Sequence, residues 1–341
     1  MKNKFWRITL DTNPEDCNLN CIMCEEHSPY SNFKQKLFDE TGIHHRRMPG
    51  EWIESIFKEA KELGVQEIIP STMGEPLIYK NTEKFFLFAR KYGIKINLTT
   101  NGTFPGKSIE EWAKLIIPVT SDTKISLNGA TKTTAEKIMQ GLDFDKQKEN
   151  IRSFVDYRNK YFIKTGYFSR VTLQLTFMQN NMHELPDIIK LAAELDIDRI
   201  KGHHLWTHFD EIKELSFKKD EKSMQKWNEI VDLAYKAAEN YRKPNGQKIL
   251  LEQIDYLKPQ ENTEVPFEYE CPFLEKELWV SATGKISPCC APDEQRNSLG
   301  DFGNYPETSI KDVFKSAVYR KLVENYKEHQ LCKVCVMRKP V

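Results

Sequence analysis

The residues with the clearest chemical meaning are three cysteines near the start of the chain. Cys17, Cys21 and Cys24 follow a C-x3-C-x2-C spacing within one short segment. Three thiolates so close together can bind three irons of a [4Fe–4S] cluster, because cysteine sulfur holds such clusters. The fourth iron then has no protein ligand, and an open metal position is where a substrate or cofactor binds. A zinc loop is the alternative, with His27 as the fourth ligand.

The other five cysteines, Cys271, Cys289, Cys290, Cys332 and Cys335, lie near the C-terminus, and no cysteine lies between the two groups. Clustered cysteines in an intracellular chain are better interpreted as metal ligands than as disulfides, so two metal sites are predicted. The spacing C-x17-C-x42-C-x2-C supplies four ligands if Cys289 is used. Cys290 is then spare, or it is the ligand and Cys289 is spare. A zinc ribbon is the alternative, but zinc sites usually pair two C-x2-C knuckles.

The composition excludes several classes of function. Fifty basic residues balance fifty acidic ones over 341 positions, which gives no reason to expect nucleic acid or a membrane as partner. Residues 1–7 lack the apolar stretch of a signal peptide, and no apolar run approaches the ~18 residues of a membrane span. We therefore expect a cytoplasmic protein, with 39% hydrophobic residues for a large core and probable room for two domains.

The elements that position the first cysteines alternate between strand and helix. This alternation predicts an α/β fold with a parallel sheet and right-handed crossovers. A partial (β/α)6 TIM barrel fits the six strands, and a doubly wound open sheet is the competing topology. Strands are expected at 8–11, 65–69, 94–100, 123–127, 171–177 and 198–201, and helices at 51–64, 82–91, 109–117, 146–160 and 184–195.

In either topology, chemistry takes place at the carboxyl ends of the strands. The segments that follow the expected strands are polar, often contain glycine and lack periodicity, as a site at this edge requires. These segments are the cysteine segment and residues 71–76, 99–102, 126–129, 179–181 and 202–204.

The remainder of the chain divides into a charged region and a small cysteine-containing domain. The charged region carries no strand signal. In the small domain, a hairpin is expected at 279–287 and a helix near 310–326. The expected regions are a core domain at 1–205, a helical linker region at 206–265 and a C-terminal α+β domain at 266–341.

With the cysteines and strand ends in place, the first 205 residues resemble the core of the radical S-adenosylmethionine (AdoMet) enzymes. In that family the open iron chelates AdoMet, whose one-electron cleavage yields a 5′-deoxyadenosyl radical that abstracts a hydrogen atom. The C-terminal cysteines are too few for a full SPASM domain and resemble its shortened form, the twitch domain. The resemblance implies AdoMet, two [4Fe–4S] clusters and a flavodoxin or ferredoxin-type electron donor.

The resemblance also assigns AdoMet-binding positions. Residues 73–76, Met-Gly-Glu-Pro, match the family's Gly-Gly-Glu-Pro segment, with methionine in place of the first glycine. Gly74 and Glu75 are therefore expected at the amino group of AdoMet. Ser126 and Asn128 match positions that contact its ribose or carboxylate, although relatives often carry aspartate at the second position.

Four further positions complete the expected AdoMet site. Met23 stands where relatives commonly carry an aromatic residue that stacks on adenine, and a thioether can pack on a purine face. Asn101 follows the third strand, and Gln174 and Thr176 lie on the fifth.

Two candidates remain for catalytic chemistry. His204, or its neighbour His203, is expected as a general base at the rim of the site, with a packing role as the alternative. Cys290 is a candidate hydrogen-atom donor, with a buried thiol as the alternative. Residues 44–47, His-His-Arg-Arg, form either a solvated basic segment or an anion-binding one.

The expected reaction is a dehydrogenation in which the auxiliary cluster accepts an electron. The ligand spacing is similar to that of a radical AdoMet dehydrogenase of aminoglycoside biosynthesis. Only sixteen residues precede Cys17, which leaves no space for a peptide-recognition domain and favours a small-molecule substrate. The alternatives are epimerisation with Cys290 as donor, bond formation on a sugar, peptide or other precursor, and a non-enzymatic zinc scaffold.

Overall fold

The computed structural model describes residues 5–259 and 264–340. Residues 1–4, in the segment where no signal peptide is expected, lie outside this description, as do residues 260–263 of the expected linker and residue 341. Among the described residues, no helix combines the length and apolar character that crossing a membrane requires.

A nine-stranded sheet, in the order β11-β10-β1-β3-β4-β5-β7-β8-β9, organises the described part of the chain. Neighbouring strands are parallel except for β10 and β11, which form an antiparallel hairpin. The six expected strands are all present, and the partial barrel is confirmed. The strands are β1 (Arg7–Leu10), β3 (Glu67–Ile69), β4 (Lys95–Thr100), β5 (Thr120–Ser126), β7 (Arg170–Phe177), β8 (Arg199–His204), β9 (Leu250–Glu252), β10 (Glu277–Val280) and β11 (Ile286–Ser287).

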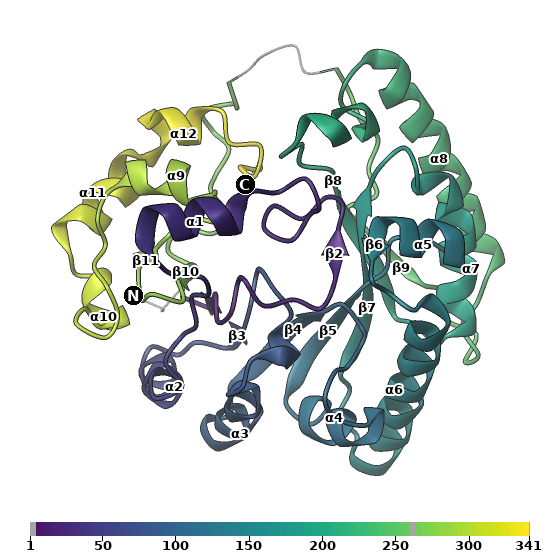
Figure 1. The fold of residues 1–341 in the computed structure, drawn as a ribbon, viewed down its shortest axis with the longest axis horizontal. Coiled ribbons are helices and arrows are strands. Elements are labelled where there is room, and N and C mark those ends of the chain that lie inside the picture. Colours follow the sequence, from purple (N-terminus) through teal and green to yellow (C-terminus); the bar gives the residue numbers. More distant parts are fainter. Residues whose placement is uncertain (1–4, 260–263, 341) are drawn as a thin grey trace.

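Helices cover the outer side of the curved sheet (Figure 1). Their apolar residues recur at helical spacing, as Ile53, Ile56, Phe57 and Ala60 do in α2, so that one face packs on the strands. Most of the expected helices are confirmed within a few residues. The covering helices are α2 (Trp52–Glu62), α3 (Thr82–Tyr92), α4 (Ile109–Ile116), α6 (Phe144–Thr165), α7 (Leu185–Glu194) and α8 (Glu221–Asn240).

The strands of the sheet alternate between a buried apolar face and a polar face. In β7, Val171, Leu173 and Leu175 are fully buried toward the helices, whereas Gln174 between them is half-buried. Side chains of a strand point alternately to its two faces, so the polar set faces the inside of the barrel. Parallel sheets are usually apolar on both faces, and the polar inner face therefore calls for a functional explanation.

Two expectations about elements are wrong, and two helices were not predicted. The region 206–265 was expected to contain no strand, but β9 pairs in parallel with β8; a three-residue edge strand is too short to show a period. The segment after the cysteines contains α1 (Phe33–Thr41), and α5 (Lys132–Ile138) follows β5. The single helix expected near 310–326 is two, α10 (Ile310–Val313) and α11 (Ala317–Asn325), because Ser316 caps a new helix through the Tyr319 N–H.

The C-terminal hairpin extends the core sheet. Strand β10 pairs in parallel with β1 from Arg7↔Glu277 to Leu10↔Val280, so the sheet runs across the expected domain boundary. The helices that follow the hairpin form a separate group beside it (Figure 1). This group comprises α9 (Asp293–Arg296), α10, α11 and α12 (Gln330–Lys333).

Candidate active site

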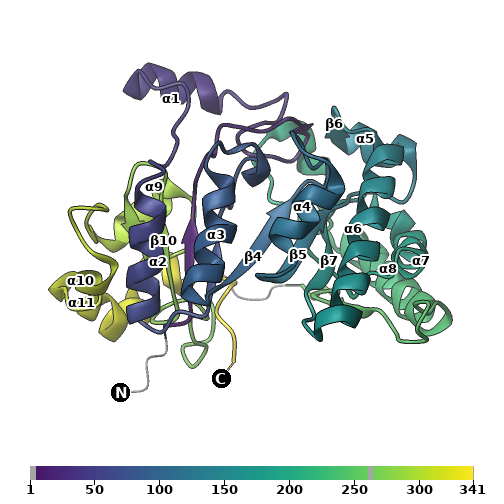
Figure 2. The ribbon, with the colours of Figure 1, turned by 90° about the horizontal axis from the view of Figure 1, so that it is seen from below.

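The segment with the first three cysteines follows β1 and is held by a short ladder. Strand β2 (Asn20–Cys21) pairs antiparallel with β6 (Met139–Gln140), which follows α5. The Ile22 N–H also donates to the Ile138 carbonyl at 2.9 Å. In Figure 2, α1, α5 and β6 all lie at the same end of the molecule. The cysteine segment is thus fixed across the carboxyl ends of the strands, where the sequence predicts the site.

The three thiols of this segment influence one another. Burial is the main cause that raises the pKa of Cys17 to about 11, and the nearby charges of Glu75 and Cys24 contribute to the rise. Burial also raises the pKa of Cys21, with Cys24 and Cys17 as additional causes. Thiols in this environment stay protonated near neutral pH, and a bound metal releases their protons. The donor set therefore fits a metal cluster held by three thiolates.

No three Cys, His, Asp or Glu side chains within the described ranges surround one common point, as the ligands of a single ion do. The thiolates of a [4Fe–4S] cluster bind different irons and need not meet at one point. His27, the fourth ligand of the zinc alternative, is buried, and its Nε2 lies 2.7 Å from the Pro14 carbonyl.

The segment after β3 is hydrogen-bonded to the residues that precede Cys17. The Glu75 N–H donates to the Asp16 carbonyl at 2.8 Å, and Asn13 Nδ2 donates to the Glu75 carbonyl at 3.0 Å. Gly74 adopts a φ of +71°, and a Cβ there would lie 2.4 Å from the Asn13 carbonyl oxygen. Glycine is therefore required, because this close approach joins the two segments expected to hold AdoMet.

The Glu75 carboxylate is buried, with 1% of the residue exposed. It accepts hydrogen bonds from Leu77 N at 3.1 Å, Thr100 Oγ1 at 2.8 Å and Asn101 N at 2.7 Å. Burial raises its pKa to about 7, against the opposing effect of these donors. The observed role of Glu75 is to fix the end of β4 to the segment after β3, and its contact with the AdoMet amino group stays a prediction.

Asn101 links the end of β4 to the cysteine segment. Its Nδ2 donates to Asn18 Oδ1 at 2.8 Å and lies 3.9 Å from Cys17 Sγ. Gln147 of α6 donates to the carbonyls of Asn101 and Ser126, at 2.7 and 2.9 Å. Sequence reasoning missed Gln147 because a polar residue on a helix gives no local sign that it reaches strand ends.

The remaining residues expected to contact AdoMet differ in the solvent exposure of their side chains. Ser126 and Gln174 are half-buried on the inner face, and Met23 is half-buried beside the cysteines. Asn128 is buried, and its Oδ1 accepts from Thr176 N at 2.8 Å. The side chain of Asn128 therefore already binds the backbone, whereas Ser126 and Gln174 remain accessible. The contacts with AdoMet stay predictions for all five residues: Met23, Ser126, Asn128, Gln174 and Thr176.

The two histidines of β8 point to opposite faces, which corrects the choice of His204. Its ring packs among Phe177, Phe217 and Trp227, with centroids 5.4, 6.4 and 4.8 Å away. His203 is exposed, and its Nδ1 lies 3.5 Å from Gln174 Nε2. Strand β8 continues through both residues instead of ending before them, so alternation turns only His203 inward. We therefore take His203 as the candidate base.

The C-terminal cysteines form a second group. Burial is the main cause that raises the pKa of Cys332 to about 12, and the charges of Cys289, Cys271 and Cys335 contribute to the rise. A hydrogen bond from the Cys290 thiol lowers the pKa of Cys289 to about 7, and the same bond raises the pKa of Cys290. The two adjacent thiols are hydrogen-bonded to each other, and the role of Cys289 as the cluster ligand stays a prediction.

Arg296 of α9 pairs with the end of β1. Its guanidinium lies 4.0 Å from a carboxylate oxygen of Asp11, and its charge contributes to the lowered pKa of Cys289. Asp11 in turn accepts a hydrogen bond from Thr72, just before the Gly74 turn. One ion pair therefore connects the strand that leads to Cys17 with the helix that follows Cys289 and Cys290.

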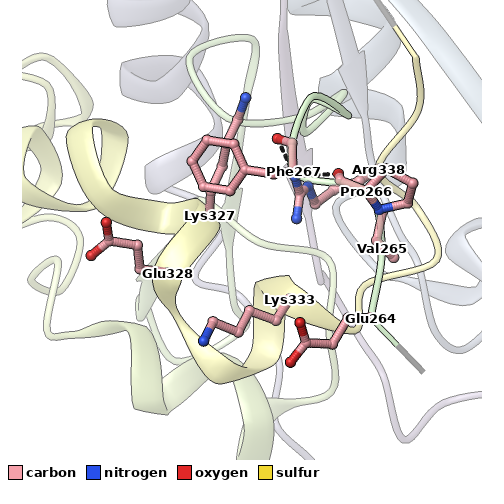
Figure 3. Close-up of a pocket in the computed structure, with 8 residues that line it drawn as sticks. All are labelled: Glu264, Val265, Pro266, Phe267, Lys327, Glu328, Lys333 and Arg338. Atoms are coloured by element: carbon pink, nitrogen blue, oxygen red, sulfur yellow. Dashed lines mark hydrogen bonds between the residues drawn. The ribbon is translucent and has the colours of Figure 1, made fainter. Parts of the chain in front are cut away.

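A separate cavity of about 500 Å³ lies between the segment at 264–267 and the last helices (Figure 3). Arg338 supports it by donating to the carbonyls of Pro266 and Phe267, at 3.0 and 2.9 Å. No residue of the predicted site lines it. The lining residues are Glu264, Val265, Pro266, Phe267, Lys327, Glu328, Lys333 and Arg338.

Comparison with known families agrees with both groups of cysteines. The radical SAM superfamily model matches residues 14–192, and that of the SPASM iron–sulfur cluster-binding domain matches residues 271–336. The chain belongs to the radical SAM superfamily. Its cofactors are therefore AdoMet and iron–sulfur clusters, and the zinc alternatives are set aside.

Two curated relatives match parts of this radical SAM chain. Fe-coproporphyrin III synthase of Methanosarcina barkeri is 27% identical over 191 residues, which cover 55% of this chain and 41% of the relative. A probable GTP 3′,8-cyclase of Pyrococcus abyssi is 33% identical over 89 residues, 26% of this chain and 25% of the relative. The chain thus spans less than half the length of either relative.

Solved structures share the fold of the radical SAM chain. Streptococcus suis SuiB bound to S-adenosylmethionine has a TM-score of 0.67 at 15% identity, covering 97% of this chain and 72% of SuiB. The enzyme anSMEcpe with bound AdoMet has a TM-score of 0.65 at 17% identity, covering 98% and 85%. At these identities the likeness supports the fold alone.

Proposed function

We propose that this radical SAM enzyme oxidises a small molecule by removing two hydrogens. Cys17, Cys21 and Cys24 would hold the cluster that binds AdoMet, and the C-terminal cysteines would hold the auxiliary cluster. When bound, these groups supply a radical that takes one hydrogen atom from the substrate and an acceptor for one electron. The second hydrogen leaves as a proton, and His203 is the proposed acceptor on the inner face. A flavodoxin or ferredoxin-type protein is the proposed electron donor.

The observation that carries this proposal is that the second group of cysteines belongs to a unit joined to the core sheet. Cys289 and Cys290 follow the β10–β11 hairpin, whose strand β10 pairs with β1, and Arg296 of α9 pairs with Asp11 at the end of β1. An electron released at the inner face of the barrel therefore has a proposed acceptor beside the same strands. The ligand set and hydrogen bonds of that cluster would set its potential.

Epimerisation is the second candidate, because the chain holds a fifth C-terminal thiol. Cys290 is half-buried beside Cys289, and four thiolates suffice for the auxiliary cluster. In that reaction Cys290 would return a hydrogen atom to the substrate, and the resulting thiyl radical would be reduced to the thiol by one electron from the proposed donor protein and one proton from solvent. The two candidates differ in the mass of the product and in the dependence on Cys290.

The test combines the loaded enzyme with a metabolite extract, AdoMet and a reductant without oxygen. Dehydrogenation predicts a product lighter by two hydrogen atoms, formed in a 1:1 ratio with 5′-deoxyadenosine. Cys332→Ala should stop product formation while some AdoMet cleavage continues, and Cys290→Ala should have little effect. A product of unchanged mass that takes up deuterium from heavy water, together with an inactive Cys290→Ala enzyme, would instead establish epimerisation.

A further inference from the structure

The inner face of the barrel carries a layer of charged side chains below the strand ends. Arg7 of β1 pairs with Glu67 at 2.6 Å and with Glu277 at 3.5 Å. On the opposite side, Arg199 of β8 pairs with Glu252 at 2.6 Å and with Asp122. These arginines have carboxylate partners, as buried charges require.

Two lysines of the same face are less well paired. Lys124 of β5 is half-buried, and within residues 5–259 and 264–340 no ion pair or hydrogen bond of its side chain is recorded. Lys201 of β8 lies 3.6 Å from Glu252, a carboxylate that Arg199 already holds at 2.6 Å. Arg199 and Lys201 therefore share Glu252, whereas Lys124 makes no direct ion pair.

The charge of Lys201 acts on the ammonium group of Lys124. Burial lowers the pKa of Lys124 to about 8, and the charge of Lys201 is the next cause. Asp122 and Glu67 act in the opposite direction, and Arg7 adds to the lowering. The Lys124 ammonium group has these carboxylates nearby but makes no direct ion pair, and an anion bound between the two lysines would supply one.

The strand register places this pair next to the expected AdoMet site. Ser126 is paired with Gln174, and Gln174 with Lys201, so these three side chains form one row across β5, β7 and β8. Lys124 lies two residues before Ser126 on the same face, which is about 7 Å deeper in the barrel. A substrate whose reacting carbon lies near Ser126 can therefore place a second group between Lys201, in the same row, and Lys124, one row deeper.

We propose that Lys124 and Lys201 bind an anionic group of the substrate, a carboxylate or a phosphate, inside the barrel. This inference shares one assumption with the proposed function, namely that the substrate binds at the inner face of the barrel. An ammonium group gives strong, charge-assisted hydrogen bonds to either oxyanion. The substrate class is thus a small organic anion whose charged group lies several bonds from the carbon that loses hydrogen.

The test measures binding without turnover. The loaded enzyme with AdoMet is titrated, in the absence of reductant and oxygen, with inorganic phosphate in one arm and with glutarate in the other, by calorimetry in a chloride buffer. At least one probe should bind, with a Kd raised about tenfold or more in Lys124→Met and in Lys201→Met. The control is Lys114→Met, which removes an exposed lysine of α4 paired with Glu110 and should bind like the wild type.

The arm that binds identifies the group, phosphate or carboxylate. Binding of neither probe to the wild type, or equal binding to all three variants, would overturn the proposal. If a methionine variant fails to load its clusters, acetylation of the wild-type enzyme decides: the probe should slow modification of Lys124 but not of Lys114, and equal rates would overturn the proposal. A failed search for a dehydrogenated product would leave these binding results unchanged, so the two proposals fail separately.

Discussion

The backbone N–H of Asn101 donates a 2.7 Å hydrogen bond to Oε2 of Glu75, which fixes the end of β4 to the segment after β3. Asn101 also reaches Cys17 Sγ, at 3.9 Å. One buried carboxylate therefore orients the amide that lies beside the first cysteine. This arrangement makes Glu75 a structural centre of the site as well as a candidate ligand of AdoMet.

We expect Glu75→Gln to separate these two roles. The amide oxygen can still accept from Leu77 N and Thr100 Oγ1, but an NH2 group then faces Asn101 N, so the free energy of unfolding should fall by about 1–3 kcal/mol. A charge-assisted bond to the AdoMet ammonium is worth roughly 1.5–3 kcal/mol, so the Kd for AdoMet should rise about tenfold or more. Chemical denaturation and equilibrium dialysis measure the two quantities.

Glu75→Ala is the harsher counterpart of that change. It leaves the donors at Leu77, Thr100 and Asn101 without their acceptor, and each buried unsatisfied group costs about 1–3 kcal/mol. It should therefore lower stability by several kcal/mol. An unchanged AdoMet affinity in Glu75→Gln, with Glu75→Ala strongly destabilised, would show that Glu75 is structural only.

Gly74→Ala should disrupt AdoMet binding through the backbone. Its Cβ would lie 2.4 Å from the Asn13 carbonyl oxygen and 2.7 Å from that of Asp16, so the two segments must separate. Gly64→Ala is the matched control, because Gly64 has a similar φ of +75° but open space around its Cβ position. We expect weaker AdoMet binding only in Gly74→Ala, and equal affinity in the two variants would contradict the proposed contact.

The half-buried ring of His204 should make the fold sensitive to acid. Burial lowers its pKa to about 4, below about 6.5 in the unfolded chain. Between these two pKa values the unfolded state binds more protons than the folded state. The contribution of neutral His204 to the free energy of unfolding is therefore complete above pH 6.5 and is lost as the pH falls toward 4. The loss is about 2 kcal/mol at pH 5. His204→Phe should lose less stability than the wild type between pH 7 and pH 5.

This comparison uses metal-free protein, because clusters that dissociate in acid would also change the measured stability. His44→Phe replaces an exposed histidine and should leave the wild-type pH dependence unchanged. If His204→Phe and the wild type lose equal stability on acidification, the ring is not held neutral by its aromatic neighbours.

The cysteine groups, the six core strands and the polar strand ends could be predicted because each is a local pattern. The orientation of His203 and His204 could not, since it depends on where β8 ends. Strand β9 has three residues, and only its pairing with β8 reveals it.

The inner charged layer was missed for a similar reason. Lys124 and Lys201 have the alternation of an ordinary solvent-facing strand, and only the curvature of the sheet brings that face inside a barrel. The amide oxygen of Asn128 binds Thr176 N, a contact between strands that the sequence does not reveal, and its predicted contact with AdoMet stays a prediction.

The central claim is that Cys17, Cys21 and Cys24 hold a cluster that cleaves AdoMet, while the C-terminal cysteines hold a second one. The most direct test compares the wild type with the Cys17→Ala, Cys21→Ala, Cys24→Ala triple variant after anaerobic reconstitution, by iron analysis and by 5′-deoxyadenosine release with dithionite. We predict about eight irons and active cleavage in the wild type, and about four irons with no cleavage in the variant. Unchanged iron in the variant, or stoichiometric zinc in the wild type, would contradict the account.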